Sequence, residues 1–201
     1  MSTKQLCDNI IRMPNDQIIG LAKNNFLPAD VQMAIAKHWY KRAHHYLAEN
    51  IGLDEKVRDY LWSDKCNKGY VLKTTMLMCG HYRANPEKYW ELYENYPSAW
   101  SRSGWRMSQA FFGHSWYTSR YGQAASATPS DLLNKIFDER YSKSKVGTQN
   151  PASYYYGQNP KYQLERLATH DNVDLKLAIK LSQCGYENVQ KLGFKKIVEL
   201  S

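Results

Sequence analysis

The residues best suited to contact a ligand lie in one stretch, from Tyr96 to Tyr121, which combines basic and aromatic side chains and has no acidic residue. Arginine pairs with phosphates through two parallel hydrogen bonds, and exposed aromatic rings stack on unpaired bases. Residues four apart share one face of a helix, so Arg102 and Arg106 would point the same way. The stretch indicates a nucleic-acid-binding surface formed by Arg102, Arg106, Arg120, Trp100, Trp105, Trp116, Tyr117 and Tyr121.

A second basic set surrounds the tyrosine cluster at 154–156 and consists of Arg140, Lys143, Lys145 and Lys161. If it faces the same side as the first set, the two form one electropositive surface. The alternative is a solvated loop whose charges have no ligand.

The aromatic side chains of the first stretch allow two further interpretations. They could form the core of the domain, with the arginine stems lying along it. They could also anchor a protein interface, where Trp, Tyr and Arg contribute most of the binding energy. The sequence leaves both alternatives open beside the nucleic-acid surface.

Signatures of catalysis or metal binding are missing from the sequence. There is no G-x-S-x-G, G-x-x-x-x-G-K-[ST], H-E-x-x-H or G-x-G-x-x-G motif. Two close pairs of possible ligands exist, Cys79 with His81 and His44 with His45, and neither has the second pair that a tetrahedral zinc site requires. No catalytic residue, metal or cofactor is therefore predicted.

Composition indicates one globular helical domain over residues 1–201, with 43% apolar and 23% charged residues. The net charge is +8, and most of it comes from residues 95–164, which favours an acidic protein or a nucleic acid, DNA or RNA, as partner. Four cysteines without a C-x-x-C pair are typical of reduced thiols in a cytoplasmic protein. We expect no signal peptide, and the apolar run 76–79 is too short to span a membrane.

One phrase recurs along the chain and indicates which elements would position these residues. It reads Leu-Ala-Lys-Asn from Leu21, Leu-Ala-Glu-Asn from Leu47 and Leu-Ala-Thr-His from Leu167. In each copy apolar residues follow the opening leucine at offsets 6, 10 and 14, which places them on one buried stripe of a helix. Leu-Ala then ends the preceding helix, and the Asn or His lies in the connection.

The phrase resembles the helical repeats of the leucine-rich repeat variant and HEAT/armadillo group, in which Leu-Ala-x-Asn precedes an apolar helix. The resemblance covers roughly residues 17–95 and 160–184, including a weaker copy that ends at Asn95. It implies a curved helical solenoid with a binding surface and specifies no ligand.

We therefore predict an all-α fold of short HEAT-like repeats, an irregular solenoid or a compact helical array, with long loops in its second half. The repeat-like part spans 17–95, the basic aromatic part 96–164 and the C-terminal helices 161–200. Period-2 alternation is scarce, so no sheet is expected. Thr128, followed by Pro129, is predicted to cap a helix that ends near Tyr141. The other predicted helices are 4–12, 29–49, 54–63, 68–79, 87–94, 98–112, 161–169, 172–184 and 187–200, with loops at 113–127 and 142–160.

These observations favour a non-enzymatic binding module that binds nucleic acid. The alternative is a protein-docking modulator or inhibitor, and the Lys, Asn and Tyr content suits a phage or other viral protein from an AT-rich genome. A third possibility is a nucleic-acid-processing enzyme such as a HEAT-like DNA glycosylase, which also needs a basic aromatic cleft.

Overall fold

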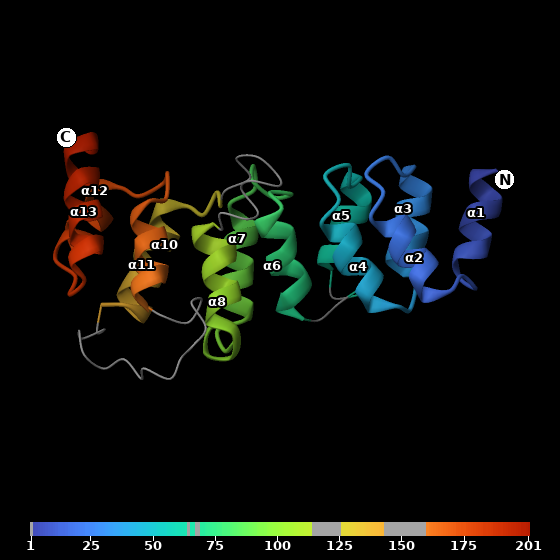
Figure 1. Ribbon diagram of the computed structural model, residues 1–201, viewed down its shortest axis with the longest axis horizontal. Coiled ribbons are helices and arrows are strands. Elements are labelled where there is room, and N and C mark those ends of the chain that lie inside the picture. Colours follow the sequence, from blue (N-terminus) through green and yellow to red (C-terminus); the bar gives the residue numbers. More distant parts are fainter. Residues whose placement is uncertain (1, 64, 67–68, 114–125, 143–159) are drawn as a thin grey trace. The chain divides into compact units, whose positions relative to one another are not determined.

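The computed structural model describes residues 2–63, 65–66, 69–113, 126–142 and 160–201, and for 101–105 it describes only the backbone. All regular secondary structure in these ranges is helical, and they contain no strand (Figure 1). The predicted all-α class is confirmed.

The chain divides into two compact units, Met1–His81 and Tyr82–Ser201. The helices of the first unit are α1 (Thr3–Ile10), α2 (Asn15–Ala22), α3 (Ala29–Lys37), α4 (Lys41–Ala48), α5 (Glu55–Trp62) and α6 (Tyr70–Met78). Those of the second unit are α7 (Glu87–Asn95), α8 (Ala99–Phe112), α10 (Ser130–Arg140), α11 (Pro160–Ala168), α12 (Leu175–Ser182) and α13 (Glu187–Leu200).

Within the first unit, helices two apart in the chain pack side by side. The helices α1, α3 and α5 form one row and α2, α4 and α6 form the other, with further contacts between the rows. Each short helix turns one apolar face inward, so the core lies between the two rows. Its fully buried side chains include Ile10, Ile18, Ile35, Leu47, Leu61, Leu72 and Met76.

The second unit follows the same alternation. The helix α11 packs against both α8 and α13, while α10 packs against α12. At the start of this unit, Tyr93 of α7 packs edge-on against Phe111 of α8, and its hydroxyl donates a hydrogen bond to Glu139 of α10. Burial and the Glu139 carboxylate raise the pKa of Tyr93 to about 12.

The three copies of the recurring phrase adopt the same turn. The last helical residue is Ala22, Ala48 or Ala168, and the next helix begins seven residues later in each case. The following polar side chain accepts a hydrogen bond from the amide two residues on: Asn24 from Phe26 at 2.9 Å, Asn50 from Gly52 at 2.8 Å and His170 from Asn172 at 3.0 Å. This local bond fixes the chain reversal in each copy.

Neighbouring turns of the first unit are joined by side-chain bonds to backbone carbonyls, which we call the turn contacts. The Asn50 amide donates to the carbonyl of Asn24 at 2.5 Å, and a ring nitrogen of His81 lies 2.8 Å from the carbonyl oxygen of Ala48. The buried Gln32 donates to the carbonyl of Gly52 at 2.9 Å. These bonds satisfy buried carbonyls and hold each turn against the one before.

The stripe predicted from the phrase is confirmed at its second and third positions, because Val31, Ile35, Val57 and Leu61, with Leu177 and Leu181, are all buried. At the first position Val173 is buried, but Leu27 and Leu53 are only half-buried. They lie in the turns, just before their helices begin, where part of the side chain faces solvent.

Two predicted helix boundaries are wrong. Residues 29–49 form two helices because His38 has an extended backbone with ψ 147°. Its ring accepts a hydrogen bond from the backbone amide of Tyr40 at 3.1 Å. Thr128 does not cap α10, since its hydroxyl donates to the Phe111 carbonyl at 2.7 Å and Pro129 occupies the cap position.

Candidate functional site

The basic aromatic stretch is partly a piece of the core. Trp100 is buried, stacked on Phe111 with ring centroids 5.8 Å apart, and in contact with Tyr93 and Phe112. The guanidinium of Arg140 lies 5.8 Å from the Trp100 ring and covers it from the solvent side. The predicted stacking face of Trp100 is therefore occupied within the protein, as the core interpretation requires.

The other predicted contact residues are only partly placed. Arg106 and Lys161 are half-buried and contact other residues of the chain. Among the predicted residues whose side chains are described, the structure places Arg140 against Trp100. Outside the described part lie the side chains of Arg102 and Trp105, and all of Arg120, Trp116, Tyr117, Tyr121, Lys143 and Lys145.

A groove of about 710 Å³ lies between α11 and α13. Helical spacing turns one face of each helix toward it, because residues three, four and seven apart share a face. Tyr162, Glu165, Arg166 and Thr169 line it from α11, and Asn188, Lys191, Leu192 and Lys195 line it from α13. We call this site the α11–α13 groove.

The position of α13 depends on a close contact with α12. A Cβ atom at Gly193 would lie 2.5 Å from the backbone nitrogen of Ser182, so only glycine permits this approach. The contact sets the distance between α13 and α12 and so helps to position the α13 side of the groove.

Arg166 differs from the other cations of the groove because its guanidinium forms no ion pair or hydrogen bond within the described residues. Its side chain is half-buried, and burial lowers the pKa of the Arg166 guanidinium. A charge removed from water without a partner is unfavourable, so Arg166 has an unused capacity to bind an anion.

The lysines of the groove are already paired. Lys191 contacts Glu187 at 2.6 Å, and Lys195 lies 3.8 Å from Glu199. Glu165 accepts a hydrogen bond from the Asn188 amide at 3.2 Å. The groove thus offers one unpaired cation among compensated charges, together with the apolar surface of Leu192 and Tyr162.

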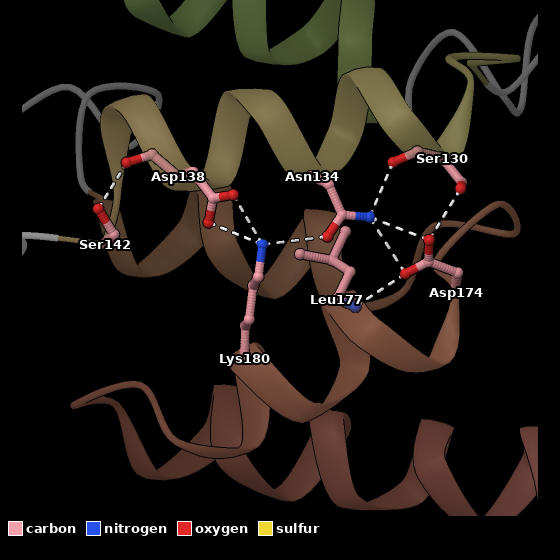
Figure 2. A network of polar contacts seen from close by, with 7 residues as sticks. All are labelled: Ser130, Asn134, Asp138, Ser142, Asp174, Leu177 and Lys180. Atoms are coloured by element: carbon pink, nitrogen blue, oxygen red, sulfur yellow. Dashed lines mark hydrogen bonds and ion pairs between the residues drawn. The ribbon is translucent and has the colours of Figure 1, made fainter.

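A second polar cluster, between α10 and α12, has its hydrogen bonds satisfied internally (Figure 2). The carboxylate of Asp174 caps α12 and accepts bonds from Leu177, Ser130 and Asn134 between 2.8 and 3.1 Å. Lys180 contacts Asp138 at 2.7 Å and Asn134 at 3.2 Å. These bonds join the two helices and leave little capacity for a ligand.

A cysteine and a histidine meet inside the first unit. The Sγ atom of Cys66 lies 3.4 Å from Nδ1 of His44, whose Nε2 lies 2.9 Å from the carbonyl oxygen of His38. A nucleophile, a base and an orienting group in this order resemble a catalytic arrangement. However, both side chains are buried, and burial raises the pKa of the Cys66 thiol and lowers that of His44 to about 4. The pair is neutral at pH 7 and lies away from solvent.

Large apolar side chains are also exposed on the connections of the first unit. Phe26 and Ile51 are 93% and 67% exposed on the turns that precede α3 and α5. Trp39 and Ile11 are exposed on the connections that precede α4 and α2. Such groups favour contact with another macromolecule where they are held next to each other.

In the described ranges no three His, Cys, Asp or Glu side chains are grouped so that they could hold a metal ion. The described helices also include none long and apolar enough to cross a bilayer. Comparison of the chain with protein-family models, curated proteins and solved structures gives no match.

Sequence reasoning missed the α11–α13 groove. Its residues belong to two helices separated by α12, and the segment 165–201 as a whole carries nearly balanced charge, so composition gave no signal there. The helical spacing of Tyr162, Arg166 and Thr169 was visible, but an unpaired charge is a property of the folded chain alone.

Proposed function

We propose that the protein is a docking module that holds an acidic segment of a partner protein in the α11–α13 groove. The half-buried guanidinium of Arg166, which has no counter-ion among the described residues, is the observation that carries this proposal. A partner carboxylate would accept two parallel hydrogen bonds from it and restore the compensation that folding removed.

The remaining lining of the groove favours a protein segment over a phosphate backbone. A nucleic acid would place successive phosphates near Glu165 and near the carboxylates already paired with Lys191 and Lys195. A peptide can instead present a single carboxylate next to an apolar side chain, which would pack on Leu192 and Tyr162. Bound apolar surface contributes roughly 25 cal/mol per Å² before the cost of association.

The test is a fluorescence-anisotropy screen of a peptide library in which one Asp or Glu is placed at varied distances from an aromatic residue. We expect some members to bind the wild-type protein at physiological salt. The matching Asn or Gln peptides should bind at least about tenfold more weakly. Arg166→Gln should abolish the difference between acidic and amide peptides.

Lys176→Gln is the matched control, because Lys176 is an exposed cation on α12 outside the groove lining. It should leave peptide affinity unchanged. If no acidic peptide binds in an Arg166-dependent manner, the groove is not a docking site for acidic segments.

Nucleic-acid binding remains the second candidate, favoured by the net charge of +8 and by the acid-free stretch from Tyr96 to Tyr121. It predicts affinity that falls with salt at a log–log slope of roughly −0.7 to −0.9 per phosphate contact. Replacing Arg102, Arg106 and Arg120 together should then flatten the slope by about two to three. Filter binding with single-stranded and duplex DNA and RNA at two salt concentrations measures this.

A further inference from the structure

Two exposed apolar residues of the first unit lie on neighbouring turns, and we call them the Phe26 ridge, consisting of Phe26 and Ile51. Their turns touch: the Asn50 side chain bonds to the carbonyl of Asn24, and a Cβ atom at Gly52 would lie 2.3 Å from the carbonyl oxygen of Asn25. The two turns that carry the ridge residues therefore lie against each other.

The backbone beneath the ridge is held in place. The Asn24 side chain accepts a hydrogen bond from the backbone amide of Phe26, and the Asn50 side chain accepts one from the backbone amide of Gly52. The buried Gln32 also bonds to the carbonyls of Leu27 and Gly52, both at 2.9 Å. A side chain presented on a fixed backbone loses less conformational freedom on binding.

A carboxylate without an ion pair accompanies the ridge. Asp30 is exposed in the first turn of α3, four residues after Phe26, and forms no ion pair within the described part of the chain. Two other charged residues of these turns and of α5 are engaged, since Lys23 lies 4.6 Å from the Tyr46 ring and Glu55 pairs with Arg58. Phe26 and Asp30 thus place an exposed aromatic group and an exposed carboxylate four residues apart at the start of α3.

This pair complements the α11–α13 groove, whose features are apolar surface beside the unpaired Arg166. We infer that the Phe26 ridge of one copy docks in the α11–α13 groove of a second copy, with Asp30 facing Arg166. The inference rests on the proposed function of the groove and names the segment that occupies it.

The contact joins two different surfaces, so a pair of copies keeps one unused ridge on one copy and one unused groove on the other. Such head-to-tail contacts form chains unless their rotation closes a ring. One groove buries less area than the roughly 1,600 Å² of a standard stable interface, so the association is weak and depends on concentration.

Sedimentation velocity over roughly a hundredfold range of protein concentration tests the inference. Wild-type protein should rise from monomer to dimer and larger species. Phe26→Ala/Asp30→Asn and Arg166→Gln should each weaken association about tenfold or more. An equimolar mixture of these two variants should give dimers and nothing larger, because it contains one working ridge and one working groove per pair.

Charge exchange separates a direct contact from an indirect effect. Asp30→Arg and Arg166→Asp should each remain monomeric, and the double variant Asp30→Arg/Arg166→Asp, in which both charges are exchanged, should associate again. Trp39→Ala removes an exposed aromatic residue from another connection and should leave association unchanged.

A wild-type protein that stays monomeric throughout, or an association that is insensitive to Arg166, overturns the inference. The peptide screen keeps the two proposals separate. Arg166-dependent peptide binding without self-association would leave the docking function standing and remove the second copy as partner, whereas loss of both would remove both.

Discussion

At the scale of single residues, the proposed docking depends on Arg166. Its charge is half-buried and has no counter-ion among the described residues. Arg166→Met keeps most of the stem packing and removes the charge. We therefore expect a free energy of unfolding that is unchanged or higher by up to about 1 kcal/mol. Urea unfolding measures this. A loss of more than about 2 kcal/mol would show that the guanidinium has a structural partner.

Two buried histidines predict acid sensitivity. Burial is the main cause that lowers the pKa of both His44 and His170 to about 4, below the usual value of 6.5. Between these values the unfolded chain binds more protons than the folded one. Stability should therefore fall as the pH drops from about 6.5 to about 4, by up to about 3 kcal/mol per histidine.

Chemical denaturation at a series of pH values checks this prediction. The double variant His44→Gln/His170→Gln should show a flatter dependence of the free energy of unfolding over the same pH window. An unchanged slope would assign the acid sensitivity to other groups.

At the scale of elements, glycines in two helices give opposite expectations. Gly193→Ala would place a Cβ against the backbone of α12, so α13 must move, at a cost of about 1–3 kcal/mol and with weaker peptide binding in the groove. Gly20 lies on the exposed face of α2, and a Cβ atom there would meet no atom within 4 Å. Gly20→Ala should therefore raise the free energy of unfolding by about 0.5–1 kcal/mol. Thermal unfolding distinguishes them, and equal effects would contradict the packing of α12 on α13.

Most helices were predictable because each carries its own apolar stripe, as in Val57 and Leu61. The end of α3 at Lys37 could not be predicted, because it depends on a hydrogen bond from the amide of Tyr40 to the ring of His38. The segment contains no glycine or proline that would mark a break. The burial of Trp100 could not be predicted either, since an aromatic residue next to arginines is equally compatible with a core position and with a surface position. Kinship with the leucine-rich repeat variant and HEAT/armadillo group stays a prediction.

At the scale of the whole molecule, the charge of +8 affects any binding assay. A basic protein binds polyanions through counter-ion release, whatever its specific ligand. We expect weak binding of single-stranded DNA at low salt, largely lost at physiological salt. Arg166→Gln should not alter it, because one charge of the net excess changes little. A strong Arg166 dependence in filter binding would place the nucleic acid in the groove.

The turn contacts carry a consequence for changing the length of the first unit. Each turn offers a carbonyl to the side chain of the next turn, and Asn24 and Asn50 are 26 residues apart. A tandem copy of residues 24–49 would bring its own asparagine, its own Gln32 and a carbonyl for its successor. Its phenylalanine would fall at the position equivalent to Gly52, where a Cβ atom would lie 2.3 Å from a carbonyl oxygen, so the copy needs glycine there. Such an insertion keeps the register of both rows, whereas an insertion of one residue within a turn separates every later donor from its acceptor. We therefore expect chain growth in steps of this length to leave the existing bonds unchanged.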